Sequence, residues 1–502
     1  MIDPRQKISF REKVGYSFGD AGANFVFQTM LMFQLLFYTD TFGISAAAAG
    51  TLLLVGRFWD AFFDPFMGVV ADRTNTKWGK FRPWVLWSAV PFGILFTLTF
   101  TTPHFGATGK LIYAYITYFL LMTIYSVNNL PYSALNGVMT SDVNERTLLS
   151  SYRFFFAMAA TFVVQGLTLP LVNKFGQGDN AKGWSLTIGL FSILAIVFFV
   201  ITFFSARERV HPDPNQKSSF KQDFADLLKN TPWKAMFVLT LFLFTTLALR
   251  GTALFYYFTY YVDKTRLFDL LRSCGMVTTA LNAGGLWHGI LNTFGLIATD
   301  DQKNVVSVGF GFFNMSAQVL TILGVLCSTT LSSRFGKKGV YVTGLFLTSI
   351  FAALFIVLPP GAVGLMFLLN ILLALSYAPT IPLLWAMMAD VADYSEWKTH
   401  RRATGVVFSG IVFALKAGLG LGGAICGWLL GCFGYVPNAI QTGYSLLGIR
   451  ITASVVPAVT FFVGVVALGL FYGIDKKLNL QIQDELVERR KKFAPQSPLP
   501  GT

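Results

Sequence analysis

Twelve runs of mostly apolar residues follow one another along this chain, and each is long enough to cross a lipid bilayer. They lie at 15–39, 45–70, 83–102, 112–140, 152–173, 185–205, 234–262, 305–331, 340–358, 362–388, 403–431 and 453–473. About 20 apolar residues form a helix that spans the hydrocarbon core, so each run predicts a transmembrane helix. Only 13% of the residues are charged, whereas soluble proteins carry about a quarter. The sequence therefore predicts an all-α membrane protein.

The distribution of basic residues predicts how the chain is oriented. Of the 39 Lys and Arg, 27 fall on the side that includes the N-terminus, eight fall on the opposite side, and four lie inside the apolar runs. Cytoplasmic loops are enriched in Lys and Arg, so both termini are expected in the cytoplasm. The net charge of +14 follows from this topology, and no nucleic-acid partner is expected. The polar, basic start of the chain predicts no cleavable signal peptide.

A polar stretch at the centre divides the runs six and six. The predicted organisation is an N-terminal six-helix bundle at 1–205, a central cytoplasmic loop at 206–232, a C-terminal six-helix bundle at 233–473 and a cytoplasmic tail at 474–502. The halves resemble each other, because Pro131 precedes Asp142 by eleven residues just as Pro379 precedes Asp390. Such internal repeats are typical of secondary transporters. An insertion at 264–303 is predicted to form an interfacial or cavity-capping helix pair, not a thirteenth span.

The second apolar run contains two acidic residues, Asp60 and Asp64, with Arg57 just before them. A spacing of four residues places both carboxylates on one face of a helix. A charge at the centre of a bilayer costs roughly 2.5–3.5 kcal/mol or more, so these side chains are expected to face an interior cavity and bind an ion. The alternative is a structural ion pair with Arg57 and Arg153.

Several short motifs occur together in a characteristic order. They are Gly15-Tyr-Ser-Phe-Gly19, Arg57-Phe-Trp-Asp-Ala-Phe-Phe-Asp-Pro65, Trp78-Gly-Lys-Phe-Arg-Pro83, Asn129-Leu-Pro-Tyr132, Arg153-Phe-Phe155, Tyr256-Tyr-Phe-Thr-Tyr260, Ala389-Asp-Val-Ala-Asp-Tyr394 and Lys416. Outside 264–303, the chain resembles the glycoside–pentoside–hexuronide:cation symporter family, which includes melibiose permease. The resemblance implies a major facilitator fold of twelve transmembrane helices in two six-helix bundles. It also implies cation-coupled sugar uptake by alternating access across a bacterial inner membrane.

The resemblance assigns cation binding to the carboxylates of Asp60 and Asp64, with Ser126 as a further candidate ligand. A hard cation such as Na⁺ needs several oxygen ligands. Phe63 stands where the family has an amide that helps to set cation choice, which favours H⁺ over Na⁺. A carboxyl in a low-dielectric site is protonated more readily, so protonation is an alternative coupling step. No cofactor is expected, and no metal apart from possible Na⁺ at this pair.

Asn24 and Asn129 stand where the resemblance places two sugar-binding acids. Their loss leaves the cations Arg57, Arg153, Arg250 and Lys416 against two aspartates, which predicts a positive cavity and favours a uronate-containing oligosaccharide. The alternative is that Asn24 and Asn129 bond the hydroxyl groups of a neutral sugar. Lys416 is expected to reach towards the aspartate pair. The candidate aromatic platforms for a sugar are Tyr125, Tyr132, Tyr256 and Trp385.

Charged residues in the loops predict a gate at the cytoplasmic side. The candidate gating residues are Asp72, Arg73, Asp142, Arg146, Asp390 and Asp393. No enzyme motif stands in a supporting context, so the predicted partners are a sugar or glycoside and the bilayer, with the protein a monomer. Two alternatives stay open, namely a lysolipid-type symporter and a sensor that binds sugar without transporting it.

Overall fold

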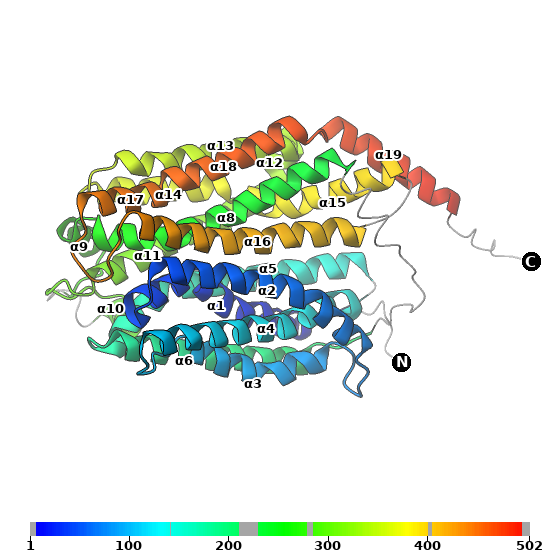
Figure 1. The fold of residues 1–502 in the computed structure, drawn as a ribbon. Coiled ribbons are helices and arrows are strands. Elements are labelled where there is room, and N and C mark those ends of the chain that lie inside the picture. Colours follow the sequence, from blue (N-terminus) through cyan, green and yellow to red (C-terminus); the bar gives the residue numbers. More distant parts are fainter. Residues whose placement is uncertain (1–6, 141, 210–228, 279–284, 400–403, 494–502) are drawn as a thin grey trace, which may run out of the picture.

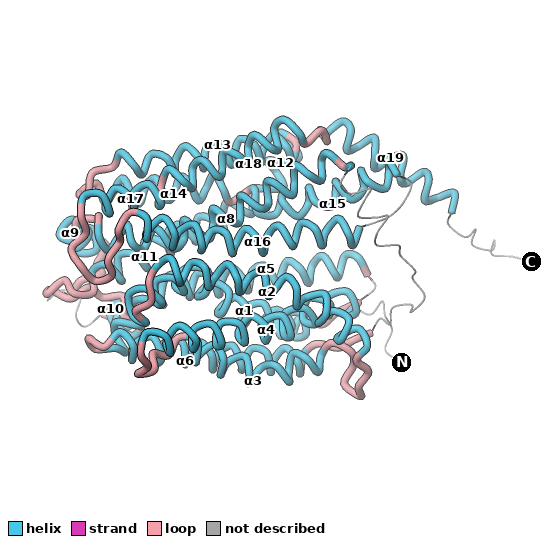
Figure 2. The backbone as a smooth tube through the Cα atoms, viewed as in Figure 1, coloured by secondary structure: helices cyan, strands magenta, loops and turns pink. Residues whose placement is uncertain are grey.

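A computed structural model describes residues 7–140, 142–209, 229–278, 285–399 and 404–493, which are almost entirely helical. Long, roughly parallel helices form two groups that lie side by side (Figure 1). The first bundle consists of α1 Phe10–Leu36 with its π-helical extension η1 Phe37–Phe42, α2 Ala46–Arg73, α3 Arg82–Thr99, α4 Ala107–Met139, α5 Val143–Gly176 and α6 Asn180–Ser205. Loops are confined to the two ends of the helices (Figure 2).

The second bundle contains more interruptions than the first. Its helices are α8 Thr231–Tyr260, α11 Val305–Leu326, α12 Ser328–Phe335, α13 Lys337–Leu354 with η2 Phe355–Val357, α14 Val363–Tyr377, α15 Thr380–Thr399, α16 Thr404–Cys432, α17 Gly443–Ala453 and α18 Val455–Phe471, followed by α19 Lys476–Phe493. Two spans are thus built from consecutive helices, α14 with α15 and α17 with α18. The predicted central loop at 206–232 falls largely outside the described residues, so this boundary stays a prediction.

Each of the twelve predicted runs is helical in its described part. Ten helices or helix pairs among the described residues are long and apolar enough to cross a membrane, and α1 and α3 occupy the other two runs. Capping side chains stabilise the starts of helices. At the start of α8, for example, Asn230 Oδ1 accepts a hydrogen bond from the backbone N–H of Trp233 at 3.1 Å. Pro65, Pro131 and Pro170 lie inside helices, which bundled membrane helices tolerate.

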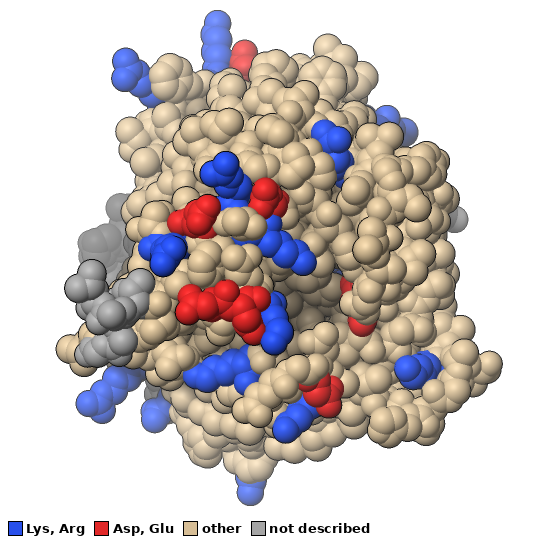
Figure 3. Space-filling view, turned by 90° about the vertical axis from the view of Figure 1, so that its left-hand side faces the viewer, with Lys and Arg blue, Asp and Glu red and all other residues tan. Residues whose placement is uncertain are grey.

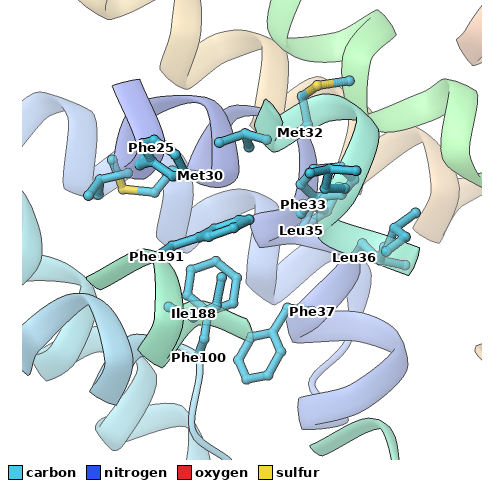
Figure 4. Close-up of a cluster of buried hydrophobic side chains, with 14 of the residues drawn as sticks. Phe25, Met30, Met32, Phe33, Leu35, Leu36, Phe37, Phe100, Ile188 and Phe191 are labelled. Atoms are coloured by element: carbon cyan, nitrogen blue, oxygen red, sulfur yellow. The ribbon is translucent and has the colours of Figure 1, made fainter. Parts of the chain in front are cut away.

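Aromatic and methionine side chains pack α1 against its neighbours in the first bundle. Figure 4 shows Phe25, Phe33 and Phe37 close to Phe191 of α6, with Phe100 beside them. The rings of Phe25 and Phe191 meet edge to face, with centroids 5.1 Å apart. Edge-to-face pairs of this kind add about 0.5–1.5 kcal/mol beyond the burial of their surface. This packing fixes the position of α1 within the first bundle. The same helix also contacts α8 of the second bundle.

Both described chain ends lie at one end of the helices, here called the terminal face, and the insertion lies at the other, the insertion face (Figure 1). The insertion forms two short helices, α9 Lys264–Ser273 and α10 Leu286–Thr293. Ten and eight residues are too few to cross a bilayer, so the insertion is a helix pair and not a further span. It reaches the first bundle, because Lys174 Nζ of α5 donates to the carbonyls of Asn292 and Thr293 at 2.6 and 2.9 Å.

Helices α2 and α16 join the two bundles through glycines. A Cβ at Gly50 would lie 2.9 Å from the carbonyl oxygen of Ala424, and one at Gly427 would collide with the carbonyl of Ala46. Small residues at such positions let the backbones of membrane helices approach closely.

We expect Gly427→Ala to destabilise the protein by about 1–3 kcal/mol, because the added methyl group overpacks the α2–α16 contact. Unfolding of the purified protein in detergent measures this loss. Gly469→Ala in α18 is the matched control, since a Cβ there meets open space. Equal stability of the two variants would contradict close packing of α2 on α16.

Candidate functional site

The two aspartates of the second run meet a lysine from the opposite bundle. Asp60 is 1% exposed, and its Oδ1 accepts a hydrogen bond of 2.5 Å from Ser126 Oγ of α4. Lys416 Nζ of α16 lies 2.9 Å from Asp60 Oδ2 and also forms an ion pair with Asp64. Four of the predicted residues are therefore brought together at one point. One ammonium group faces two carboxylates there, which leaves the cluster with a formal charge of −1 if all three are ionised.

Two neighbours of this cluster supply no carboxylate or oxygen ligand. The guanidinium of Arg57, 6% exposed, lies 5.8 Å from the centre of the Phe27 ring, and no salt bridge of Arg57 is seen among the described residues. The Phe63 ring stacks on Trp59 with centroids 6.3 Å apart. The alternative of a structural pair between the aspartates and Arg57 or Arg153 is not what the geometry shows, because Lys416 takes that place.

A second ion pair joins α1 and α5, and the sequence patterns did not predict it. Asp20 of α1 pairs with Arg153 of α5, whose Nε and Nη2 lie 2.5 and 3.3 Å from the two carboxylate oxygens. The Arg153 guanidinium also lies 4.9 Å from the centre of the Tyr132 ring. Asp20 is an acid inside an apolar run, four residues before Asn24, and that spacing was the available signal. Asn24 Nδ2 donates to the carbonyl of Asp20 at 2.9 Å.

The predicted aromatic platforms divide into two kinds. Tyr132 and Tyr256 are fully buried, and their hydroxyl groups bond the carbonyl of Tyr16 and the hydroxyl of Thr39. Both pack between helices in this conformation, and their role as sugar platforms stays a prediction. The Tyr125 hydroxyl lies 3.4 Å from Asn129 Nδ2, which places those two together, while Trp385 is 40% exposed on α15.

A cavity of about 360 Å³ lies between the bundles, lined by residues of α1, α5, α8, α11, α14 and α15. Its polar lining consists of carboxamides, threonines and Tyr377, and includes no charged side chain. The carboxamides are Asn24, Gln28, Gln165, Asn314 and Gln318. The apolar part of the lining includes Phe154, Met158 and Leu247. The chamber is therefore polar but uncharged.

Asp20 reduces the predicted surplus of positive charge to four cations, Arg57, Arg153, Arg250 and Lys416, against three carboxylates. Arg153 is neutralised by Asp20, and Lys416 is held by two aspartates. Arg250 points to Asn370 Oδ1 at 3.3 Å and lies 5.4 Å from the centre of the Phe355 ring, inside the second bundle. A count of charges along the sequence does not show which charges are paired between helices, so the sign of the cavity stays a prediction.

Hydrogen bonds cross between the bundles at the insertion face. Asp40 Oδ1, at the end of η1, accepts from the Tyr435 hydroxyl at 2.5 Å, and its carbonyl accepts from Asn438 Nδ2 at 2.8 Å. Asn173 of α5 donates to Ser307 of α11 at 2.5 Å. Basic and acidic side chains are interspersed over the middle of this face, beside a hollow (Figure 3). These contacts close the insertion face.

At the terminal face, three ion pairs each connect residues of the same bundle. Asp72 pairs with Lys80 in the loop after α2 at 2.9 Å, and Asp390 pairs with Lys337 at 2.7 Å. Glu12 holds Arg209 at 2.7 Å, and this hydrogen bond raises the pKa of the guanidinium. Hydrogen bonds between the bundles thus close the insertion face in this conformation.

The remaining predicted gating residues lie at the end of α2, around the start of α5 and within α15. Asp142 Oδ1 accepts from the backbone N–H of Glu145 at 3.1 Å. Arg146 donates to the carbonyl of Thr140 at 3.0 Å, which ties α5 to the end of α4. Arg73 is exposed at the end of α2, and Asp393 lies about one helical turn beyond Asp390. Their gating role stays a prediction.

Comparison with known proteins identifies the family. The sequence matches the family described as MFS/sugar transport protein over residues 15–299 and 301–476. The putative glycoside/cation symporter YagG of Escherichia coli is 35% identical, with 96% of each chain covered. The chain belongs to the glycoside–pentoside–hexuronide:cation symporter family. As a member of this family, it is an integral membrane transporter and not an enzyme, as the motifs predicted.

Three further proteins are similar to this member of the symporter family. The inner membrane symporter YicJ of E. coli is 33% identical over 97% of this chain and 96% of its own. The isoprimeverose transporter of Lactiplantibacillus pentosus is 31% identical over 94% and 90%. Among solved structures, the nucleoside transporter NupG has a TM-score of 0.57 at 14% identity, covering 92% of this chain and 98% of that one. That likeness confirms the major facilitator fold predicted for the symporter.

Proposed function

We propose that this chain is a cation-coupled symporter of a glycoside, with H⁺ favoured over Na⁺ as the coupling ion. It works by alternating access across the bacterial inner membrane, with the insertion face outside and both termini in the cytoplasm. The observation that carries the proposal is the ion pairing of Lys416, in the second bundle, with Asp60 and Asp64 in the first. Because this ion pair joins the two bundles, the charge of the carboxylates affects how strongly the bundles are held together.

Coupling follows from the charge of this cluster. With both carboxylates ionised, Lys416 is attracted by two negative charges and holds α16 against α2. Protonation of one carboxylate removes half of that attraction and leaves the cluster neutral, so that the bundles can separate there. Charge interactions of this kind are much stronger in a low-dielectric interior than in water. The loaded cluster is thus free to change conformation, whereas the ionised one is held.

Proton coupling is favoured because few oxygen ligands surround the pair. Ser126 is the hydroxyl that contacts Asp60, at 2.5 Å, and Phe63 presents a ring where an amide would supply an oxygen. Na⁺ needs several oxygen ligands, and Lys416 would have to leave before it could bind. A proton needs only one carboxylate oxygen.

The sugar is assigned to the space beside the Asp20–Arg153 pair, near Asn24 and Asn129. An arginine held by a carboxylate keeps N–H groups that can donate to hydroxyl oxygens, while the carboxylate can accept from them. The lining of the adjacent cavity favours a neutral glycoside over a uronate, because it presents carboxamides and no cation.

The test is sugar-induced pH change in de-energised proteoliposomes. We use isoprimeverose as the neutral disaccharide, methyl α-D-xylopyranoside as a one-ring probe and glucuronosyl-xylose as the acidic disaccharide, each with and without Na⁺. We expect alkalinisation of the medium by a neutral glycoside without Na⁺, lost in Asp64→Asn and kept in the loop control Asp301→Asn.

Other results would overturn particular parts of the proposal. A response that requires Na⁺ contradicts proton coupling, and a response to the uronate alone contradicts the neutral substrate. Sugar binding without flux would make the protein a sensor. Flux of a lysolipid in place of any sugar would favour the lysolipid alternative.

A further inference from the structure

We propose that the carboxamide-lined cavity is a subsite for a second, neutral sugar ring, so that the substrate is a glycoside of at least two rings. This inference rests on the proposed function, because it assumes that the first ring lies beside Asp20 and Arg153. It assigns a binding role to Gln28, Gln165, Asn314 and Gln318, none of which was singled out in the sequence.

The first argument is the chemistry of the lining. Carboxamides from α1, α5 and α11 surround the cavity, and together they come from both bundles. A carboxamide offers two N–H donors and a carbonyl acceptor, which matches sugar hydroxyl groups, since each of these both donates and accepts. A carboxylate would find donors there but no cation to balance its charge, and a hydrocarbon chain would leave the amides unpaired.

The second argument is an unsatisfied polar group. Asn314 is 7% exposed, lines the cavity, and its buried Nδ2 has no hydrogen-bond partner. Leaving a buried donor without a partner costs roughly 1–3 kcal/mol. Gln28, Gln165 and Gln318 line the same cavity and are half-buried. The unpaired donor of Asn314 points to a ligand that accepts a hydrogen bond, and the neighbouring carboxamides suit the same ligand.

The third argument is size and position. The volume of about 360 Å³ lies at the small end of the about 300–1,000 Å³ found for ligand sites. Asn24 connects the two places, because it lines the cavity and donates to the backbone of Asp20. Phe154, next to Arg153 in sequence, also lines the cavity and offers a ring face to the C–H side of a sugar. A second ring would therefore continue directly from the first.

The test compares one-ring and two-ring substrates in the same variants. Binding of methyl α-D-xylopyranoside and isoprimeverose to the purified full-length protein is measured by calorimetry. We expect Gln318→Leu to weaken isoprimeverose binding about tenfold, from the loss of hydrogen bonds, and to change binding of the one-ring probe less than twofold. Gln481→Leu on α19, outside the cavity, is the matched control and should alter neither.

Two further variants make the result independent of folding and of the first proposal. Gln165→Leu tests the same subsite from the first bundle if Gln318→Leu does not fold. Gln318→Arg adds a cation and should shift preference from isoprimeverose towards glucuronosyl-xylose by at least about tenfold. Equal weakening of both neutral probes, or no weakening of either, would overturn the subsite while leaving glycoside transport intact. Failure of the unmodified protein to bind any of the three probes would instead contradict the proposed function.

Discussion

Replacing Asp60 by Asn is expected to abolish gradient-driven accumulation of the sugar while exchange of sugar across the membrane continues. The amide keeps the shape of the side chain and can still accept a hydrogen bond from Ser126. Lys416 and Asp64 then form a neutral pair, as in the proton-loaded state, so the bundles can change conformation without a proton. A membrane potential of about 100 mV is worth about 2.3 kcal/mol per charge, which supports roughly 50-fold accumulation. In the variant the ratio should fall to one.

The measurement is uptake of labelled isoprimeverose into energised proteoliposomes, together with counterflow in the absence of a gradient. Asp301→Asn is the control, because Asp301 is an exposed acid in the loop before α11, with 50% of its side chain exposed. It should keep both activities. Accumulation by Asp60→Asn at the level of the unmodified protein would show that this carboxylate does not couple transport to the ion.

Removing the carboxylate of Asp20 is expected to destabilise the protein by about 3 kcal/mol. Breaking a buried ion pair costs about 3–5 kcal/mol, because the remaining charge is left without a partner. The lower end applies here, since 16–18% of each side chain stays exposed. The double variant Asp20→Asn/Arg153→Gln should recover most of the loss, because no buried charge remains. Unfolding of the purified protein in detergent provides the comparison.

The exposed pair of Asp301 and Lys303 is the matched control for this cycle. Lys303 is 85% exposed and Asp301 50%, and exposed pairs contribute only about 0–1 kcal/mol. Asp301→Asn should therefore have little effect. If the double variant is as unstable as the sum of its two single changes, Asp20 and Arg153 do not stabilise each other.

The helices of this protein could be predicted because the bilayer imposes strict local requirements. A backbone in lipid must satisfy its own hydrogen bonds, so each long apolar run becomes a helix wherever it packs. The spacing of Asp60 and Asp64 fixed their common face for the same local reason. Asp20 is also an acid in an apolar run, like Asp60 and Asp64. A count of charges in the cavity must include it, because it pairs with Arg153.

The sequence could not predict which side chains pair between helices that are far apart in the chain. Arg153 could have faced a substrate or a carboxylate, and only the packing of α5 against α1 shows that it meets Asp20. Tyr132 and Tyr256 carry the right side chains for a sugar platform, yet helix packing buries both. The role of an isolated polar residue depends on its neighbours in space.

The sequence by itself determined the membrane class, the twelve apolar spans, the family and the paired carboxylates, since each depends on local composition, spacing or motif order. Only the tertiary structure decided which charges neutralise one another and which side chains line the chamber. The five carboxamides of the cavity lie between residues 24 and 318 on three helices, and nothing local marks them as neighbours. Their meeting results from the packing of two bundles, which depends on contacts between residues that are far apart in the chain.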